Sequence, residues 1–408
     1  MEAVAIAVTD TENNTLILVV TDLSWGRIQD ANTIRNAVYK KYGIPKENVL
    51  VGGTHNHSAP SAKWNSDANK AYMVMWQEQV MSAIDAAIRD RAEATMEVGS
   101  TYTENMVFSR RYKCRDGLYI GGGAQEKYNE SQIPSYLPEY MWIEEHESPA
   151  DEEIQMLKFD RGEDKKPILI TQWQSHACNV NGGSSEGEDH YKASGEWPEV
   201  IRSTLEDTLN VHCMYMQGAA GNLASMSRIK GENLYNAESD TENGTIGYSD
   251  YEAIGKKVAS YVSEAYNATG VFTKVESGLI QINQYKMPVT LREKTDDDGN
   301  VTREEREATE TERPELNTVA IGDVSLVTLP SELFDTSAKE IKDTVKSNNL
   351  FEMTLIMGYT CGSAGYEAPN KFWDHGCYEV ENGNYVKGTA DLMVQHYIKK
   401  LTELFEAK

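Results

Sequence analysis

The chain is short of basic residues, of long apolar runs and of any export signal. Its 39 Lys and Arg stand against 64 Asp and Glu, for a formal net charge of −25. An acidic surface repels phosphate backbones and anionic membranes, so we expect no nucleic acid partner. No apolar run reaches the about 18 residues of a spanning helix, so we expect no stable insertion into a membrane. The first residues have neither the basic region nor the long apolar core of a secretory signal.

Cysteine is also scarce. The five cysteines are odd in number and widely spaced, and no two form a C-x-x-C pair. This pattern argues against a disulfide framework and against a zinc knuckle built on thiolates. We therefore expect a cytoplasmic protein; a secreted protein whose leader has been removed is the alternative. A homo-oligomer is left open.

The apolar pattern indicates the fold class. No linker rich in proline, serine or glycine divides the 408 residues, which predicts one domain over residues 1–408. Apolar periodicity predicts strands at 4–8, 15–21, 49–52, 96–100, 154–159, 167–174, 211–216, 278–285, 317–329 (a hairpin) and 351–358, and helices at 33–42, 68–91, 196–209, 251–267, 332–348 and 388–406. This order predicts an α/β (α+β) fold in which helices flank mixed β-sheets. Residues 291–314 are charged and nearly free of apolar side chains, and we expect a polar loop or insertion there.

The most informative segment is 54–60, which reads Thr-His-Asn-His-Ser-Ala-Pro directly after an apolar strand. His55 and His57 are two residues apart, so on an extended segment both side chains point to the same side. Two neutral imidazoles that leave a strand together suit a catalytic metal, although two surface histidines in a turn would show the same spacing. On spacing alone, both histidines are candidate ligands.

Polar groups follow three further strands. His176 ends the strand at 167–174, Glu332 stands where a strand gives way to a helix, and Tyr366 follows the last strand. Each has an ordinary explanation: a core histidine, a charge stabilised by a helix dipole, or a packed tyrosine. Polar groups at the ends of four strands nevertheless converge on one pocket more naturally than they serve four unrelated purposes.

Taken in order, these segments resemble the neutral ceramidases, zinc amidases that cleave the N-acyl bond of ceramide. The segment 54–60 is similar to the family's T-H-T-H-S-G-P. Later blocks resemble H-G-T (at His176), S-A-D-Y-P (194–198), Q-x-N-A-G-D (217–222), V-P-G-E (329–332) and the family's last block (Tyr366 with 378–379). The resemblance spans residues 1–380 and implies a neutral-ceramidase-like catalytic domain.

The resemblance also implies roles for single residues. It makes His55, His176, Glu332 and Tyr366 the ligands of a Zn²⁺ ion. It makes His57 a catalytic group that polarises or protonates the scissile bond without binding the metal.

Two further residues are expected at the same site. The substrate-binding arginine of the family corresponds to Arg110, with Arg111 as a near alternative. We expect Gly221 to permit a close backbone approach, with an N–H that can face the pocket.

The chain departs from the family at the serine long regarded as the nucleophile. Ala224 occupies that position, and Ser225 comes one residue late, where an extended chain faces the other way. We also expect the chain to lack the family's earlier N-terminal segment and its immunoglobulin-like C-terminal domain. Ala224 is compatible with a reaction in which zinc-bound water attacks the carbonyl and no serine is needed.

The sequence therefore predicts a zinc-dependent hydrolase that cleaves an amide (N-acyl) bond of a small or lipid-like substrate, a smaller and more soluble N-acyl compound being favoured over ceramide. An esterase or lactonase with the same site is an alternative. A non-catalytic binding protein on the ceramidase scaffold is another.

Overall fold

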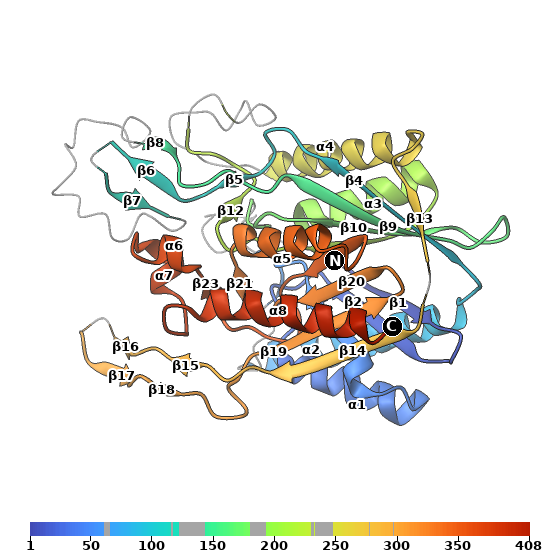
Figure 1. Cartoon of the computed structure of the whole chain (residues 1–408), viewed down its shortest axis with the longest axis horizontal. Coiled ribbons are helices and arrows are strands. Elements are labelled where there is room, and N and C mark those ends of the chain that lie inside the picture. The colour runs from blue at the N-terminus through green and yellow to red at the C-terminus, as the bar shows by residue number, and fades with distance from the viewer. Residues whose placement is uncertain are drawn as a thin grey trace.

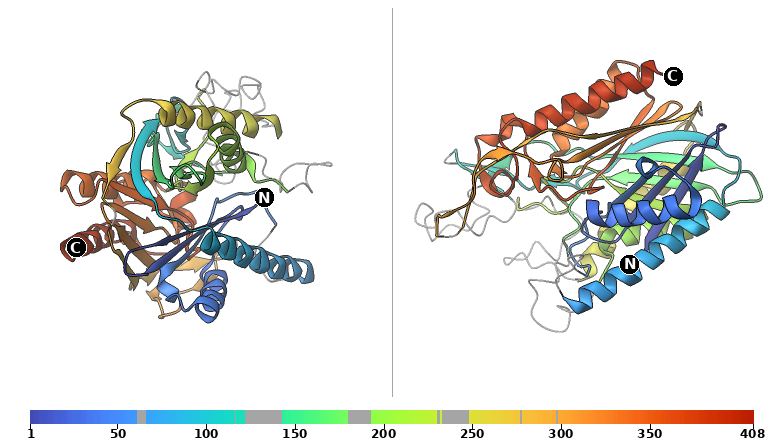
Figure 2. Two further views of the ribbon diagram at one scale, coloured as in Figure 1. Left: turned by 90° about the vertical axis from the view of Figure 1, so that its right-hand side faces the viewer. Right: turned by 90° about the horizontal axis from the view of Figure 1, so that it is seen from below.

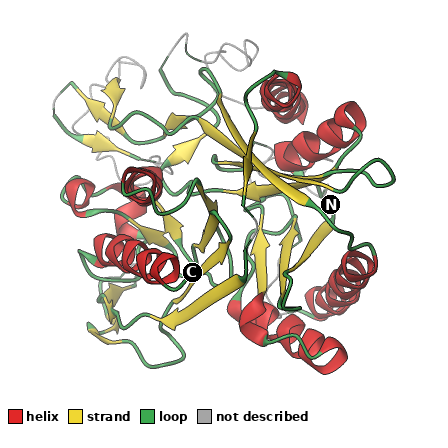
Figure 3. Ribbon diagram, turned by 45° about the vertical axis from the view of Figure 1, so that its right-hand side comes forward, coloured by secondary structure: helices red, strands yellow, loops and turns green. Residues whose placement is uncertain are grey.

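The computed structural model describes residues 1–60, 66–115, 117–121, 143–179, 193–229, 232, 248–276, 278–296 and 298–408 (Figure 1). Its fold is mixed α/β, with several mixed sheets flanked by helices, as the apolar pattern predicted. Strands fill the interior and most helices lie at the periphery (Figure 3). Within the described ranges, no helix is long and apolar enough to cross a bilayer.

The first sheet contains the segment that leads to the histidine pair. It has the order β1-β2-β3, made of β1 (Ala3–Thr9), β2 (Thr15–Thr21) and β3 (Val49–Gly53). β1 and β2 form the expected antiparallel hairpin, and β3 is parallel to β2. The helices α1 (Ile28–Tyr42) and α2 (Asp67–Arg89) pack on this sheet (Figure 2). All residues of β2 and β3 are buried, which explains their continuous apolar sequences.

The second sheet leads to His176. Its order is β11-β10-β9-β4-β13, with β4 (Thr95–Tyr102), β9 (Glu153–Asp160), β10 (Ile168–Trp173), β11 (His212–Gln217) and β13 (Thr273–Val275). β10 and β11 are parallel, and the other pairs are antiparallel. The helices α3 (Glu196–Leu209) and α4 (Tyr248–Asn267) pack against each other and against this sheet.

The third sheet precedes Glu332 and Tyr366. Its order is β14-β19-β20-β22, with β14 (Ile280–Lys286), β19 (Glu315–Ile321), β20 (Val324–Thr328) and β22 (Met353–Met357). β19 and β20 form the expected hairpin, and β22 is parallel to β20. The helices α5 (Asp335–Ser347) and α8 (Thr389–Glu406) cover it.

Short elements complete the fold. They are β5 (Phe108–Ser109), β6 (Tyr112–Cys114), β7 (Tyr119–Ile120), β8 (Ile143–His146), β12 (Leu223–Ala224), β15 (Thr290–Leu291), β16 (Lys294–Thr295), β17 (Val301–Arg303), β18 (Arg306–Glu307), β21 (Glu332–Leu333), β23 (Tyr366–Glu367), α6 (Asn370–Trp373), α7 (Cys377–Glu381) and a 3₁₀ turn (Lys46–Asn48).

Three sequence-based expectations differ from this structure. The helix expected at 33–42 already begins at Ile28. The helix expected at 332–348 begins at Asp335, because Glu332 and Leu333 form β21 and pair in parallel with β23. The expected polar loop at 291–314 is a projecting ribbon in which β15 pairs with β18 and β16 with β17 (Figure 1). Asp296 closes its turn by accepting the N–H groups of Asp298 and Asn300, a local bond that apolar periodicity does not detect.

The ends of strands from all three sheets meet. At the end of β22, the Gly358 N–H donates to the Gln217 carbonyl at 2.7 Å. The Gly53 N–H at the end of β3 donates to the Tyr359 carbonyl at 3.2 Å. A Cβ on Gly358 would lie 2.5 Å from the Gly218 carbonyl oxygen, so a larger residue could not be accommodated there without a shift. The segments that follow these strands are therefore brought to one place.

Candidate metal centre and active site

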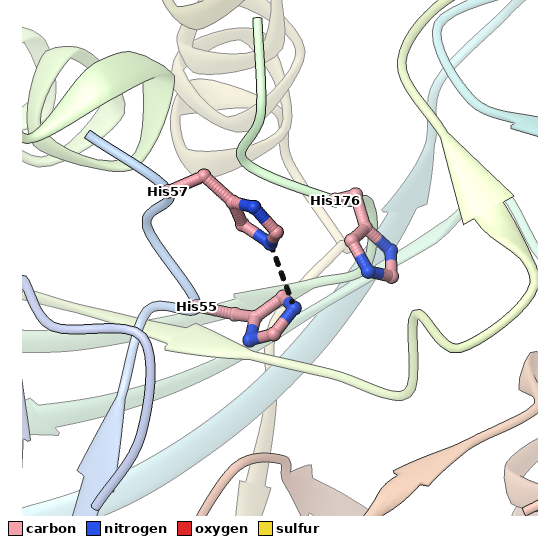
Figure 4. A group of neighbouring side chains, drawn as sticks. All are labelled: His55, His57 and His176. Atoms are coloured by element: carbon pink, nitrogen blue, oxygen red, sulfur yellow. Dashed lines mark hydrogen bonds between the residues drawn. The ribbon is translucent and has the colours of Figure 1, made fainter. Parts of the chain in front are cut away.

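Three histidines point toward one another where these segments meet (Figure 4). His55 and His57 follow β3, and His176 follows β10. One ring nitrogen of each can be chosen so that all three lie within 4.8 Å of one another. His55 and His176 are buried, whereas His57 is exposed. The structure thus brings together a group of histidines that could hold a metal ion.

Backbone carbonyls orient the two buried rings. The Nδ1 of His55 is 3.0 Å from the Ser24 carbonyl oxygen, and the Nδ1 of His176 is 3.1 Å from that of Leu223. A carbonyl oxygen only accepts, so each Nδ1 carries the proton and each Nε2 of a neutral ring presents a lone pair to the site. Histidines that bind a metal usually donate their other ring N–H to a carbonyl or carboxylate in this way.

Glu332 completes the inner group. Its Oε2 lies 3.0 Å from His176 Nε2 and 3.3 Å from His55 Nε2, and all three side chains are buried. Burial alone would raise the pKa of the Glu332 carboxyl, but charge interactions and hydrogen bonds with the two histidines hold it well below its usual value. The group therefore contains an ionised carboxylate between two imidazoles.

The lone pairs of the two Nε2 atoms and the Glu332 carboxylate repel one another unless a proton or a cation lies among them. Burial, followed by the charge of Arg110, lowers the pKa of His176 to about 3, so this ring is neutral near pH 7. A proton on His176 Nε2 would bond Glu332, as the low pKa of that carboxyl requires, whereas the neutral ring turns a lone pair toward the carboxylate. A metal ion would satisfy both nitrogen lone pairs and the carboxylate together, so these residues fit a bound metal ion.

His57 is the outer member of the group. Its Nε2 lies 3.1 Å from the Nε2 of His55, and its backbone N–H donates to the Ala177 carbonyl at 3.0 Å. The residue as a whole is exposed, but its ring packs against those of His55 and His176; desolvation of the ring, together with these two neighbours, lowers its pKa well below the usual value. This position is compatible with either role that the sequence suggested, ligand or catalytic group.

Tyr366 reaches the site through strand pairing. In the parallel register of β21 and β23, Tyr366 stands opposite Glu332, so the two predicted ligands are cross-strand neighbours. The Tyr366 ring is nearly parallel to that of His176, with 6.4 Å between centroids. Its hydroxyl oxygen accepts a hydrogen bond from Arg110 Nη2 at 2.9 Å. Burial raises the pKa of Tyr366 well above its usual value, so in the absence of a cation the phenol is neutral.

Arg110 and Arg111 have different surroundings. Arg110 contacts Tyr366, donates to the Gly221 carbonyl and pairs with Glu379, and within the described chain its Nη1 has no hydrogen-bond partner. Arg111 is fully buried, where its guanidinium binds Glu147, Glu379 and the carbonyls of residues 372 and 376. The structure therefore places Arg110 beside the predicted ligands and Arg111 in the supporting structure.

Gly221 is close to Glu332, although its N–H does not face the site. The expectation for that N–H was wrong, because it donates to the Leu333 carbonyl at 3.1 Å. A Cβ at this position would lie 2.3 Å from the Glu332 carbonyl oxygen. Gly221 thus permits the close contact that sets the position of Glu332.

The serine next to this turn is occupied elsewhere. Ala224 lies in β12, paired with Phe108 of β5. Ser225 is buried, and its hydroxyl donates to Asn179 Oδ1 at 2.9 Å. This contact gives Ser225 a structural role.

Sequence reasoning missed two aromatic neighbours of His55. The Tyr359 ring stacks on the His55 ring at 3.8 Å between centroids, and Trp25 packs edge-on against it at 5.4 Å. Tyr359 lies in the same strand-end segment as Tyr366, but no local signal separates the two tyrosines. Glu379 was also missed as the carboxylate that holds Arg110.

Comparison with known proteins supports a fold class. The sequence matches no family model and no curated protein. Among solved structures, it is similar to a ceramidase complexed with C2, with a TM-score of 0.71 and 14% identity over 98% of this chain and 69% of that one. It is likewise similar to the neutral ceramidase from Pseudomonas aeruginosa, with a TM-score of 0.70 and 15% identity over 98% of this chain and 68% of that one. The chain therefore has a neutral-ceramidase-like fold.

Proposed function

We propose that this protein is a zinc-dependent hydrolase that cleaves the amide bond of a small N-acyl compound. The observation that supports it best is the convergence of His55 Nε2, His176 Nε2 and Glu332 Oε2, with both Nδ1 atoms held by carbonyls. Nitrogen and oxygen donors of this kind are typical of catalytic zinc sites. The ceramidase-like fold favours an amide as the bond that is cleaved.

The ligand set that we propose contains His55, His176, Glu332 and Tyr366. A bound zinc would supply Lewis acidity and a water molecule with a pKa lowered to about 7. The hydroxyl oxygen of Tyr366, which accepts from Arg110, would turn a lone pair to the bound cation. His57 is left outside this set because it is the exposed member of the group.

The residues of the chain then have distinct tasks. The His57 ring, neutral near pH 7, is the exposed member of the group; its N–H can polarise a substrate carbonyl, or its free ring nitrogen can take up a proton from the attacking water and pass it to a leaving amine. Arg110 would hold an anionic or acceptor group of the substrate through its Nη1, which has no hydrogen-bond partner among the described residues. Ser225 has no catalytic task in this proposal, since its hydroxyl is bound to Asn179.

The test is metal content together with a hydrolysis screen. The protein, purified without chelator, should contain one zinc per chain, and His176→Ala should lose it. His396→Ala is a matched control, because His396 lies on α8 and stacks on Tyr285 outside the site. The screen covers N-acyl amino acids, N-acyl sugars, ceramides and simple esters, each with and without zinc. A parent protein without zinc, or a His176→Ala variant that keeps it, would contradict the proposed site.

A further inference from the structure

Glu196 is a buried acid in a backbone conformation that is unfavourable for its type. It begins α3, its side chain is buried, and its φ of 51° lies in the left-handed region. Residues other than glycine occupy that region at a cost, so contacts from the surroundings must hold it there. The surrounding segment 194–198 has no part in the proposed chemistry.

The carboxylate of Glu196 joins the two loops that carry the histidines. Its Oε1 accepts the hydroxyl of Ser58 at 2.7 Å, and its Oε2 accepts the backbone N–H of Asn179 at 2.8 Å. Ser58 follows His57 directly, and Asn179 comes three residues after His176. We call the set Ser58, Asn179 and Glu196 the carboxylate clamp.

Further bonds join the same segments. The His57 N–H donates to the Ala177 carbonyl at 3.0 Å, and the Ser194 N–H donates to the Ser58 carbonyl at 3.1 Å. These backbone bonds limit the relative movement of the loops, and the carboxylate adds the charge-assisted bonds, which are stronger than neutral ones.

We propose that Glu196 is a positioning residue that sets the separation of the His55–His57 loop from the His176 loop and thereby the affinity for the metal ion. The proposal rests on the proposed function, because it assigns the clamp to the same metal centre.

The test measures zinc affinity by competition with a chromophoric chelator, separately from the unfolding of the metal-free protein. Glu196→Ala should weaken zinc binding about 10- to 100-fold, the usual effect of removing an outer-shell partner. Glu196→Gln should stay within about threefold of the parent, since its amide can accept from Asn179 and donate to the Ser58 hydroxyl. Ser58→Ala removes only one arm of the clamp, so its effect should be smaller than that of Glu196→Ala.

A matched control separates positioning from general stability. Glu315 is another buried carboxylate; it pairs with Arg35 at 2.8 Å and accepts from Asn317, and neither partner belongs to the histidine loops. Glu315→Ala should lower stability and leave zinc affinity unchanged. If Glu196→Ala fails to fold, the weaker binding expected for Ser58→Ala carries the test.

Two results would overturn the inference: parent-like zinc affinity in folded Glu196→Ala and Ser58→Ala, or equal weakening in Glu315→Ala and Glu196→Ala. A parent protein that binds no zinc would instead refute the proposed function, and the role of the clamp with it.

Discussion

Replacing Gly221 by alanine adds one methyl group at a point where the structure has no room for it. The new Cβ would lie 2.3 Å from the Glu332 carbonyl oxygen, whereas ordinary contact begins at 3.4 Å. One of the two segments must therefore move by about 1 Å, and the segment that moves carries either Glu332 or the carbonyl that Arg110 binds. A displacement of this size near reacting groups costs on the order of 100-fold in rate.

The assay is zinc-dependent hydrolysis of the best substrate from the screen, with zinc affinity measured in parallel. Gly221→Ala should lower kcat/KM by about 100-fold and weaken zinc binding. Ser225→Ala is the matched control in the same turn, and its effect should be much smaller because the Ser225 hydroxyl only binds Asn179. The opposite order, with Ser225→Ala the more damaging change, would refute this reasoning and restore a serine nucleophile.

Two further predictions concern protons. His57→Ala should keep its zinc and lose ~10²-fold or more in hydrolysis, as is usual for a general acid or polarising donor; loss of zinc in elemental analysis would show that His57 is a ligand. Burial raises the pKa of Asp335 to about 6 from 3.8, so the folded state binds this proton more tightly and stability falls as pH rises through that window. Relative to Asp335→Asn, the parent should lose roughly 2.4 kcal/mol of unfolding free energy between pH 4 and 7 in urea titrations of the metal-free proteins. Curves with the same pH dependence would contradict the assigned shift.

Much of the fold was accessible from local sequence. Apolar periodicity located the first hairpin, β3, β10 and the closing helix, because burial on one or both faces imposes a short-range pattern. The same pattern missed the projecting ribbon at 291–314, whose strands are held by turn hydrogen bonds and pairing in solvent. It also extended α5 back to Glu332, because a two-residue strand leaves no periodic trace.

The candidate site was likewise predictable only in part from the sequence. Residue order and spacing suggested that polar groups at four predicted strand ends share one pocket, and the resemblance to the neutral ceramidases then gave roles to His55, His57, His176, Glu332 and Tyr366. Their relation in space depended on distant pairing: Glu332 faces Tyr366 because β21 lies in register with β23.

The two arginines show why sequence could go no further. Arg110 and Arg111 are adjacent and chemically identical, and no local pattern separates them. Arg110 meets Tyr366 and the Gly221 carbonyl, whereas Arg111 is enclosed by acids and carbonyls. These partners lie more than 100 residues away along the chain. Arg110 binds residues 221, 366 and 379, and Arg111 also binds residue 379. The environment of a charged side chain depends on such long-range packing, because its partners are assembled only when the sheets come together.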